Sequence, residues 1–349
     1  MSLRQVQKKT SKVISKNQYD RRDSEHNSQS ANFARRTVLK MFAGAGAASL
    51  TAGLQTSAVH AIDYSAPVPE SEGLTAYCNG QQVLIRWHNS VIAAYRASNT
   101  GKYPYLCSLA GPITGTDVTT ESSLPYSHHR GAWLGCEPLN GGDYWSDGPL
   151  SSGQIKSEGL SLVQSTDNAI VFEDKCRWMG PASASPCHDE RRFTLTAPNE
   201  RTRIIEVDLK LIADQDIVVP KAKHSFFALR AAPDISPAYG GTLINSHGDV
   251  GARSTHGKPA AWCTYFGARR LNSDVVEGIA LMDHPENPWS PCPWLTRDYG
   301  HLSPSPFSFQ TKPWTLTHND SIRLRYLMVI YGGNPDEANL QEIYKKWTS

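Results

Sequence analysis

Residues 203–213 alternate between apolar and polar side chains, and this period of two limits the fold more than any other feature of the chain. Ile205, Val207 and Leu209 fall on one face of the segment, whereas charged residues such as Asp208 fall on the other. Successive side chains of a strand point to opposite faces of its sheet. The segment is therefore predicted to be an antiparallel strand with one buried face and one exposed face.

Similar segments recur along the chain between long loops rich in Gly and Pro. They cover residues 82–87, 91–96, 169–178, 192–196, 225–232, 261–266, 278–282 and 322–330. Only residues 335–347 have the spacing of an amphipathic helix. Many strands and one short C-terminal helix predict an all-β protein, a large antiparallel β-sandwich. A supersandwich of the mutarotase type is one form of this fold.

The first 61 residues have the layout of a twin-arginine signal peptide. A polar, basic stretch precedes Arg35 and Arg36, a mildly apolar run follows at 41–54, and small residues stand before Ala61. The alternative is a membrane anchor, but a run of 14 residues is too short for a hydrocarbon core of about 30 Å. We therefore expect export by the twin-arginine machinery, a periplasmic or otherwise exported location, and cleavage after Ala61.

The chain after residue 61 is expected to be an extended lead-in at 62–74 and a single β-sandwich domain at 75–349. Without the signal peptide it keeps 25 basic and 30 acidic residues, so the formal charge of +2 becomes −5. No basic stripe remains, which argues against nucleic acid as a partner. No other apolar run is long enough to cross a membrane, so we expect no membrane span in the mature form.

Seven cysteines lie after the signal peptide, and none belongs to a CxxC pair. A zinc ribbon or a thioredoxin-like site is therefore not expected. Export permits disulfides. Cys176 and Cys187 flank a loop rich in Gly and Pro, so they either clip a hairpin together or remain thiols.

A first candidate site contains His128, His129, Arg130 and Trp133. Both histidines can reach one site from a loop, where an imidazole acts as a general acid or base near neutral pH or binds a metal. The guanidinium of Arg130 is suited to a carboxylate or to sugar hydroxyls. The structural alternative is that one imidazole bonds to the backbone and that Arg130 pairs with a buried acid.

A second candidate site follows an apolar strand and contains Asp283 and His284. A strand that ends in a polar loop is a common place for a site, and a carboxylate such as Asp283 can orient an imidazole. The alternative is a hydrogen-bonded turn that contains Pro285.

The loop that follows supplies candidate binding residues. Trp294 and Tyr299 have ring faces that can stack on a sugar, while Arg297 and Asp298 bind polar groups or form a structural ion pair. Trp262 and Tyr105 are weaker candidates. The chain has no Gly-rich phosphate loop, no G-x-S-x-G motif and no HExxH motif, which disfavours nucleotide enzymes, serine hydrolases and zincins.

The order of these motifs resembles the bacterial family labelled "methane oxygenase PmoA", or PmoA-like, over residues 75–335. The resemblance rests on residues 102–106, 111–112, 128–133, 228–230, 245–246, 261–267, 278–285 and 293–300. It implies an exported β-sandwich protein of carbohydrate-degrading bacteria. Where that family usually has Pro-Trp-His, this chain has Leu295, so any role of that histidine is in doubt here, and His301 is a candidate substitute.

Three functions are compatible with these residues. The first is a carbohydrate-processing enzyme that hydrolyses, eliminates or epimerises a small saccharide or glycoside, with His128, His129, Asp283 and His284 as catalytic residues. Its expected substrate-binding residues are Tyr105, Arg130, Trp133, Trp262, Trp294, Arg297, Asp298 and Tyr299. The second is a copper- or iron-dependent oxidoreductase with the metal on His128, His129 and His284. The third is a non-catalytic sugar-binding protein. No cofactor is assigned, and a divalent or redox metal is the alternative.

Overall fold

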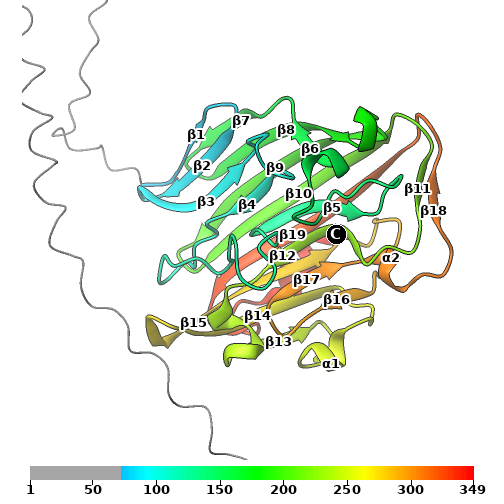
Figure 1. Cartoon of the computed structure of the whole chain (residues 1–349). Helices are drawn as coiled ribbons and strands as arrows, with labels where there is room; N and C mark the ends of the chain where they lie inside the picture. The colour runs from blue at the N-terminus through cyan, green and yellow to red at the C-terminus, as the bar shows by residue number, and fades with distance from the viewer. Residues whose placement is uncertain (1–71) are drawn as a thin grey trace, which may run out of the picture. The chain divides into compact units, whose positions relative to one another are not determined.

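The predicted strands form two large antiparallel sheets that pack face to face, and the prediction of a large β-sandwich is confirmed. The computed structural model describes residues 72–349, which form one unit (Figure 1). The twin-arginine signal peptide predicted at 1–61, and residues 62–71 of the lead-in, lie outside the described residues.

The first sheet has eight strands in the order β1-β2-β3-β4-β5-β12-β17-β16. Its strands are β1 (Leu74–Cys78), β2 (Gln82–Trp87), β3 (Ser90–Arg96), β4 (Tyr105–Cys107), β5 (Ala132–Glu137), β12 (His224–Arg230), β17 (His301–Pro304) and β16 (Trp294–Thr296). The central strands β4, β5, β12 and β17 come from distant parts of the chain, and long loops connect them (Figure 1).

The second sheet has nine strands in the order β13-β14-β15-β19-β10-β9-β8-β6, with β7 paired to β8. These are β13 (Thr242–Asn245), β14 (Trp262–Arg269), β15 (Asn272–Asp283), β19 (Ser321–Gly332), β10 (Thr202–Ala213), β9 (Cys187–Asn199), β8 (Ala169–Met179), β6 (Gln154–Ser157) and β7 (Ser161–Thr166). A small two-stranded sheet pairs β11 (Ile217–Val219) with β18 (Trp314–Leu316).

The main core lies between the two large sheets. The apolar side chains of β10, such as Ile205, Val207 and Leu209, are buried there, as the alternation predicts. Phe227 of β12 stacks on Tyr326 of β19 with ring centroids 5.1 Å apart, which joins the two layers. We call the face of each sheet that points away from this core its outer face.

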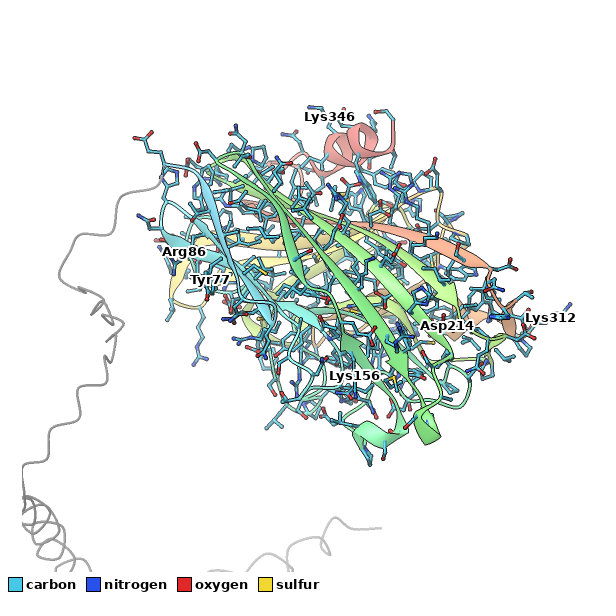
Figure 2. All side chains as sticks on the ribbon, turned by 90° about the horizontal axis from the view of Figure 1, so that it is seen from above. Tyr77, Arg86, Lys156, Asp214, Lys312 and Lys346 are labelled. Carbon is cyan, nitrogen blue, oxygen red and sulfur yellow. The ribbon has the colours of Figure 1, made fainter. Side chains whose placement is uncertain are left out.

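Helix α3 (Leu340–Thr348) covers the outer face of the nine-stranded sheet, and Figure 2 labels Lys346 on it. It forms a second apolar cluster there, in which Leu340 packs with Trp262, Met282 and Leu327. The other helices are single turns: α1 (Ala252–Thr255), α2 (Pro306–Phe309), and 3₁₀ turns at Leu150–Ser152, Pro181–Ser183, Pro233–Ile235 and Pro237–Tyr239. No helix within residues 72–349 is long and apolar enough to cross a membrane.

All seven cysteines are free thiols. Cys176 and Cys187 lie on the paired strands β8 and β9, but their cross-strand partners are Asp189 and Trp178. The hairpin register therefore sets the two sulfurs opposite other residues, and the disulfide considered from the sequence does not form.

Candidate functional site

The outer face of the eight-stranded sheet gathers polar and aromatic side chains from four strands. Tyr105 on β4 lies opposite Trp133 on β5, which lies opposite Ala228 on β12. Arg230, two residues further on β12, lies opposite His301 on β17. Directly opposite residues share one face of a sheet, as do residues two apart on one strand, so these side chains line a single surface.

Four histidines meet on this surface, and we call His128, His129, His224 and His301 the imidazole cluster. The ring of His129 lies 4.6 Å from that of His301 and 4.5 Å from that of His128. Trp145 joins His224 to the others, because its ring stacks on His224 at 4.9 Å and lies 6.0 Å from His301. The cluster is thus built from β12, β17 and two loops.

Gly131 explains how the two loop histidines reach the cluster. Its φ of +56° turns the chain between Arg130 and β5, and a Cβ at this position would lie 1.9 Å from the carbonyl oxygen of Leu106. Only glycine fits such a close backbone approach. The glycine of the His-His-Arg-Gly motif therefore holds the loop against β4, with the ring of His129 5.3 Å from that of Trp133.

Burial keeps the cluster uncharged. Burial, together with neighbouring positive groups, lowers the pKa of His129 to about 2 and the pKa of His224 to about 4. Burial also lowers the pKa of His128, and it lowers that of His301 well below the ordinary value. A buried imidazole loses its proton easily because a low-dielectric site disfavours its charged form. At neutral pH the cluster thus consists of neutral imidazoles.

Carboxylates at one edge of the cluster contact two of these imidazoles. Glu137 Oε2 lies 3.2 Å from His224 Nδ1, and Asp147 Oδ2 lies 3.7 Å from His128 Nδ1. Burial raises the pKa of Glu137, and the negative charge of Asp143 raises it further. A carboxylate beside one ring nitrogen fixes the orientation of the imidazole and leaves the other nitrogen for chemistry.

Arg230 is a buried cation in the middle of this surface. It is 2% exposed, its guanidinium carbon lies 4.4 Å from the ring centre of Tyr299, and burial lowers its pKa. Within residues 72–349 it forms no ion pair, and its Nε and Nη1 atoms have no hydrogen-bond partner. A buried guanidinium is usually paired with an acid, so Arg230 is prepared for a negatively charged or oxygen-rich ligand.

Further buried nitrogens without partners lie beside Arg230. They are His129 Nδ1, His301 Nδ1, Trp133 Nε1 and Trp145 Nε1. Leaving a buried polar group unpaired costs about 1–3 kcal/mol, and most native proteins avoid it. A local concentration of such atoms is therefore evidence for a functional site.

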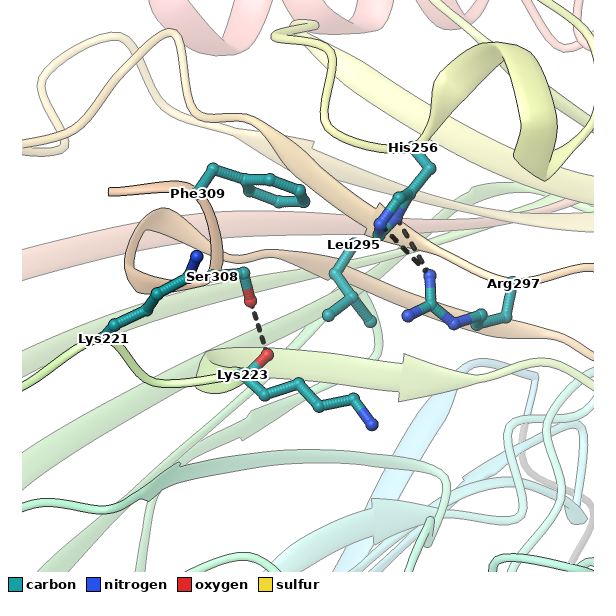
Figure 3. Close-up of a pocket in the computed structure, with 7 residues that line it drawn as sticks. All are labelled: Lys221, Lys223, His256, Leu295, Arg297, Ser308 and Phe309. Carbon is teal, nitrogen blue, oxygen red and sulfur yellow. Dashed lines mark hydrogen bonds between the residues drawn. The ribbon is translucent and has the colours of Figure 1, made fainter. Parts of the chain in front are cut away.

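Close to His224 in the chain lies a pocket of about 330 Å³, and Figure 3 shows the residues that line it. Its lining residues are Lys221, Lys223, His256, Leu295, Arg297, Ser308 and Phe309. Lys223 directly precedes His224 in the chain, and the charges of Lys223 and Arg297 both act to lower the pKa of His224. The cluster and the pocket thus belong to one electrostatic environment.

Seven of the residues predicted from the sequence lie on or beside this surface. They are Tyr105, His128, His129, Arg130, Trp133, Arg297 and Tyr299. The guanidinium of Arg130 lies over the ring of Tyr105 at 5.7 Å, and the Tyr105 hydroxyl donates to Glu121 Oε1 at 2.6 Å. Trp133 is 1% exposed, so it packs under the imidazoles instead of offering a free stacking face.

Asp283 and His284 lie elsewhere. Asp283 points into the core, where its Oδ1 accepts a hydrogen bond from Asn287 Nδ2 at 2.7 Å and burial raises its pKa to about 6. His284 lies on the outer face of the nine-stranded sheet, with its ring 4.7 Å from that of Trp347 on α3. Consecutive residues at a strand end point to opposite faces, so Asp283 does not orient His284.

Three other predicted binding residues make their contacts outside the imidazole cluster. Trp294 is fully buried, and its Nε1 donates to the carbonyl of Ala260. Trp262 packs beneath α3. Asp298 Oδ1 accepts from the backbone N–H of Ala252, so it serves the first turn of α1 and is not an ion-pair partner of Arg297 within the described chain.

The copper or iron alternative needs His128, His129 and His284 at one metal ion. In the structure His284 lies against Trp347 on the other sheet, away from His128 and His129. In the described part of the chain, no three His, Cys, Asp or Glu side chains are placed to hold a metal ion. The residues present therefore do not fit that centre.

Several residues of the site were not assigned a role from the sequence. They are Trp145, Lys221, Lys223, His224, Arg230, His256, Ser308 and Phe309. His301 was considered only as a substitute for the histidine that Leu295 replaces. The available signal was weak: His224 and Arg230 are the charged or ionisable ends of a mostly apolar strand. Their importance comes from cross-strand neighbours, which one strand does not reveal.

Solved structures with a similar fold include a protein from Synechocystis sp. PCC 6803, with a TM-score of 0.33 and 10% identity over 77% of this chain and 99% of that one. A galactose mutarotase related enzyme from Lactobacillus acidophilus has a TM-score of 0.28 and 8% identity over 74% and 97% of the two chains. A GalM/aldose epimerase homologue from C. elegans has a TM-score of 0.28 and 10% identity over 76% and 97%. Likenesses of this size carry no argument about function.

None of the curated proteins matches this chain in sequence. The expected membership of the PmoA-like family is wrong, because the family whose model matches this chain is a different one. Its description is "Family of unknown function (DUF6807)", and the match covers residues 75–345, nearly all of the β-sandwich. The chain belongs to this family, DUF6807.

Proposed function

We propose that this protein is a carbohydrate-processing enzyme that moves a proton on a sugar, by elimination or epimerisation. The observation that carries the proposal is the imidazole cluster, whose members have lowered pKa values beside a small basic pocket. An unprotonated imidazole is in the state that a general base requires, and a negatively charged group bound beside it raises its pKa and so its basicity.

Among the cluster residues, His224 is best placed to act as the base. Its side chain, like that of His128, is 18% exposed, whereas His129 and His301 are almost fully buried. Glu137 contacts its Nδ1, which leaves Nε2 for the substrate. Lys223 and Arg297 supply positive charge nearby, where negative charge develops on a substrate that loses a proton.

The carboxylates of the site favour proton transfer over hydrolysis by paired acids. Glu137 contacts His224, Asp147 contacts His128, and Asp143 lies 3.7 Å from the ammonium of Lys102. Glycoside hydrolysis commonly uses two carboxyl groups that face each other across the bond to be cleaved. Here each carboxylate is engaged by a basic partner, so the imidazoles are the available bases.

The first chemical step is the same for both reactions. His224 Nε2 takes a proton from a sugar carbon, and the electron pair stays on that carbon. In elimination this electron pair forms a C=C bond to the neighbouring carbon. The C–O bond on that neighbouring carbon breaks at the same time, and the leaving oxygen takes up a proton. In epimerisation a proton returns to the opposite side of the same carbon.

We also propose that the enzyme works outside the cytoplasm, after export by the twin-arginine machinery. The support is the Arg35-Arg36 motif and the apolar run that follows it. A small saccharide or glycoside that reaches this compartment would be its substrate.

Hydrogen exchange in D₂O tests the proposed chemistry. Purified protein is incubated with a panel of mono- and oligosaccharides, and loss of each C–H signal is followed by NMR. We expect exchange or double-bond formation with the wild type and a loss of about 100-fold or more in His224→Ala. His284→Ala is the matched control and should keep full activity, because His284 lies on the outer face of the other sheet. Hydrolysis products without any C–H exchange would refute the proposal.

A further inference from the structure

We propose that the pocket beside His224 binds the carboxylate of an acidic sugar, a uronic acid residue, and that this is the substrate class of the proposed enzyme. The inference rests on the proposed function for its site and adds the identity of the charged group. It is carried by the charges, size and surface of the pocket.

The lining of the pocket is positively charged. Lys221, Lys223 and Arg297 contribute three cations, and none of its lining residues is an acid. Within residues 72–349, none of these three cations forms an ion pair with a carboxylate, whereas seven of the fourteen other arginines there do. Unpaired cations that converge on a concavity are suited to an anionic ligand.

Arg297 is held in place for such a ligand. Its Nη1 lies 3.0 Å from His256 Nδ1 and donates to the carbonyl oxygen of Thr296 at 2.9 Å. These contacts use one nitrogen and leave Nε and Nη2 for a ligand. A guanidinium with two free nitrogens can bind the two oxygens of a carboxylate side by side. In Figure 3, Arg297 lies to the right of Leu295 and Lys223 lies below it.

The remaining surface suits a sugar ring better than an isolated inorganic anion. Leu295 and Phe309 provide apolar surface between the cations, and Ser308 adds a hydroxyl (Figure 3). A sugar acid can contact both the apolar surface and the cations, because its ring has C–H faces and its carboxylate has a full charge. The volume of about 330 Å³ lies at the lower end of the range for small-ligand sites, about 300–1,000 Å³.

The carboxylate also matches the base beside the pocket. A proton on the carbon next to a carboxylate becomes easier to remove when positive groups neutralise that carboxylate. Lys223 and His224 are neighbours in the chain, so one short segment supplies both a cation and a base. This arrangement favours a carboxylate over a phosphate, which would not acidify a ring C–H in this way.

Paired ligands test the charge requirement. Binding of galacturonate and galactose, and of glucuronate and glucose, is measured by titration calorimetry at low and high salt, with inorganic phosphate as a further probe. At low salt we expect the affinity for each uronate to be at least about tenfold higher than for its neutral partner. At high salt this difference in affinity should shrink. Equal affinity for both members of each pair would overturn the inference, and so would phosphate binding that is at least as tight.

Variants locate the binding. Arg297→Gln and Lys223→Gln should each weaken uronate binding by about tenfold and leave neutral-sugar binding unchanged. Lys346→Gln makes the same change of charge on α3 and should have no effect. Circular dichroism confirms that each variant is folded, and unchanged uronate affinity in both folded pocket variants would overturn the inference.

The two proposals fail separately: uronate binding without C–H exchange contradicts the proposed function, whereas exchange on neutral sugars without uronate preference contradicts only the inference.

Discussion

Single residues in this protein have pKa values that differ from those in water, and His224 is the most informative case. Burial and the nearby charge of Lys223 lower its pKa to about 4, although its side chain still reaches solvent. The cost is paid in stability at acid pH, because the unfolded chain binds a proton on this imidazole near pH 6.5 whereas the folded chain does not.

Replacement of His224 by Gln should therefore change how stability depends on pH. A lowered folded-state pKa adds stability above pH 6.5, and this stability is lost as pH falls toward 4. Between pH 7 and pH 5 we expect the wild type to lose about 1–2 kcal/mol more unfolding free energy than His224→Gln. Urea unfolding at the two pH values measures the difference. Asp283, whose pKa is raised to about 6, titrates in both proteins and cancels in the comparison. Parallel pH profiles would contradict the lowered pKa.

Among the elements, helix α3 has a structural role that is separate from the site. It covers apolar side chains on the outer face of the nine-stranded sheet, and Leu340 at its start is 1% exposed. The imidazole cluster lies on the outer face of the other sheet, with the main core between them. The helix should therefore affect stability and leave the chemistry unchanged.

Leu340→Ala should lower the unfolding free energy by about 2–5 kcal/mol, because it removes buried apolar volume and leaves a cavity. Urea unfolding followed by tryptophan fluorescence gives the value. Lys346→Ala, on the exposed side of the same helix, should change stability by less than about 0.5 kcal/mol. C–H exchange activity of folded Leu340→Ala should equal that of the wild type. A Leu340→Ala protein as stable as the Lys346→Ala control would show that the helix does not hold this cluster together.

At the scale of the whole molecule, two sheets of similar size have outer faces with different roles. The nine-stranded sheet is covered by α3, whereas the eight-stranded sheet bears the imidazole cluster and the basic pocket. The loops that complete the site come from distant parts of the chain. A site of this kind exists only in the folded domain, which suits an export route that carries folded proteins.

Export itself can be tested on the full chain. Conservative replacement of both Arg35 and Arg36 by Lys should leave the uncleaved precursor in the cytoplasm, because the proposed export route recognises the twin-arginine pair. Cell fractionation and immunoblotting measure precursor and mature protein. The same replacement at Arg21 and Arg22 keeps the charge and should leave export unchanged. Normal amounts of mature exported protein after loss of the Arg35-Arg36 pair would contradict the proposed route.

Much of the fold could be predicted from local patterns. The alternation of apolar and polar residues in β10 correctly predicted which face of the strand is buried. It could do so because the two-residue period is a property of the strand alone. The short C-terminal helix was also predicted, although it begins at Leu340 and not at residue 335. Half of the candidate site was predicted in the same way, because His128, His129 and Arg130 are neighbours in one loop.

The other half could not be predicted, because strand pairing decides it. Asp283 and His284 form a polar pair at a strand end, but the alternation sends one into the core and the other toward α3. Arg230 and His301 are far apart in sequence and become direct partners only where β12 meets β17. The residues next to Arg230 and His301 in the chain form no pattern that would distinguish these two from residues with a purely structural role.

The sequence alone determined that this chain forms many half-buried strands, because hydrophobic alternation acts within each segment. It also placed a loop with two histidines and an arginine before a strand. Only the tertiary structure decided which sheet each strand joins and which side chains share its outer face. The physical reason is that pairing energies and the packing of two sheets act between distant segments. The imidazole cluster and the unpaired Arg230 are products of that packing.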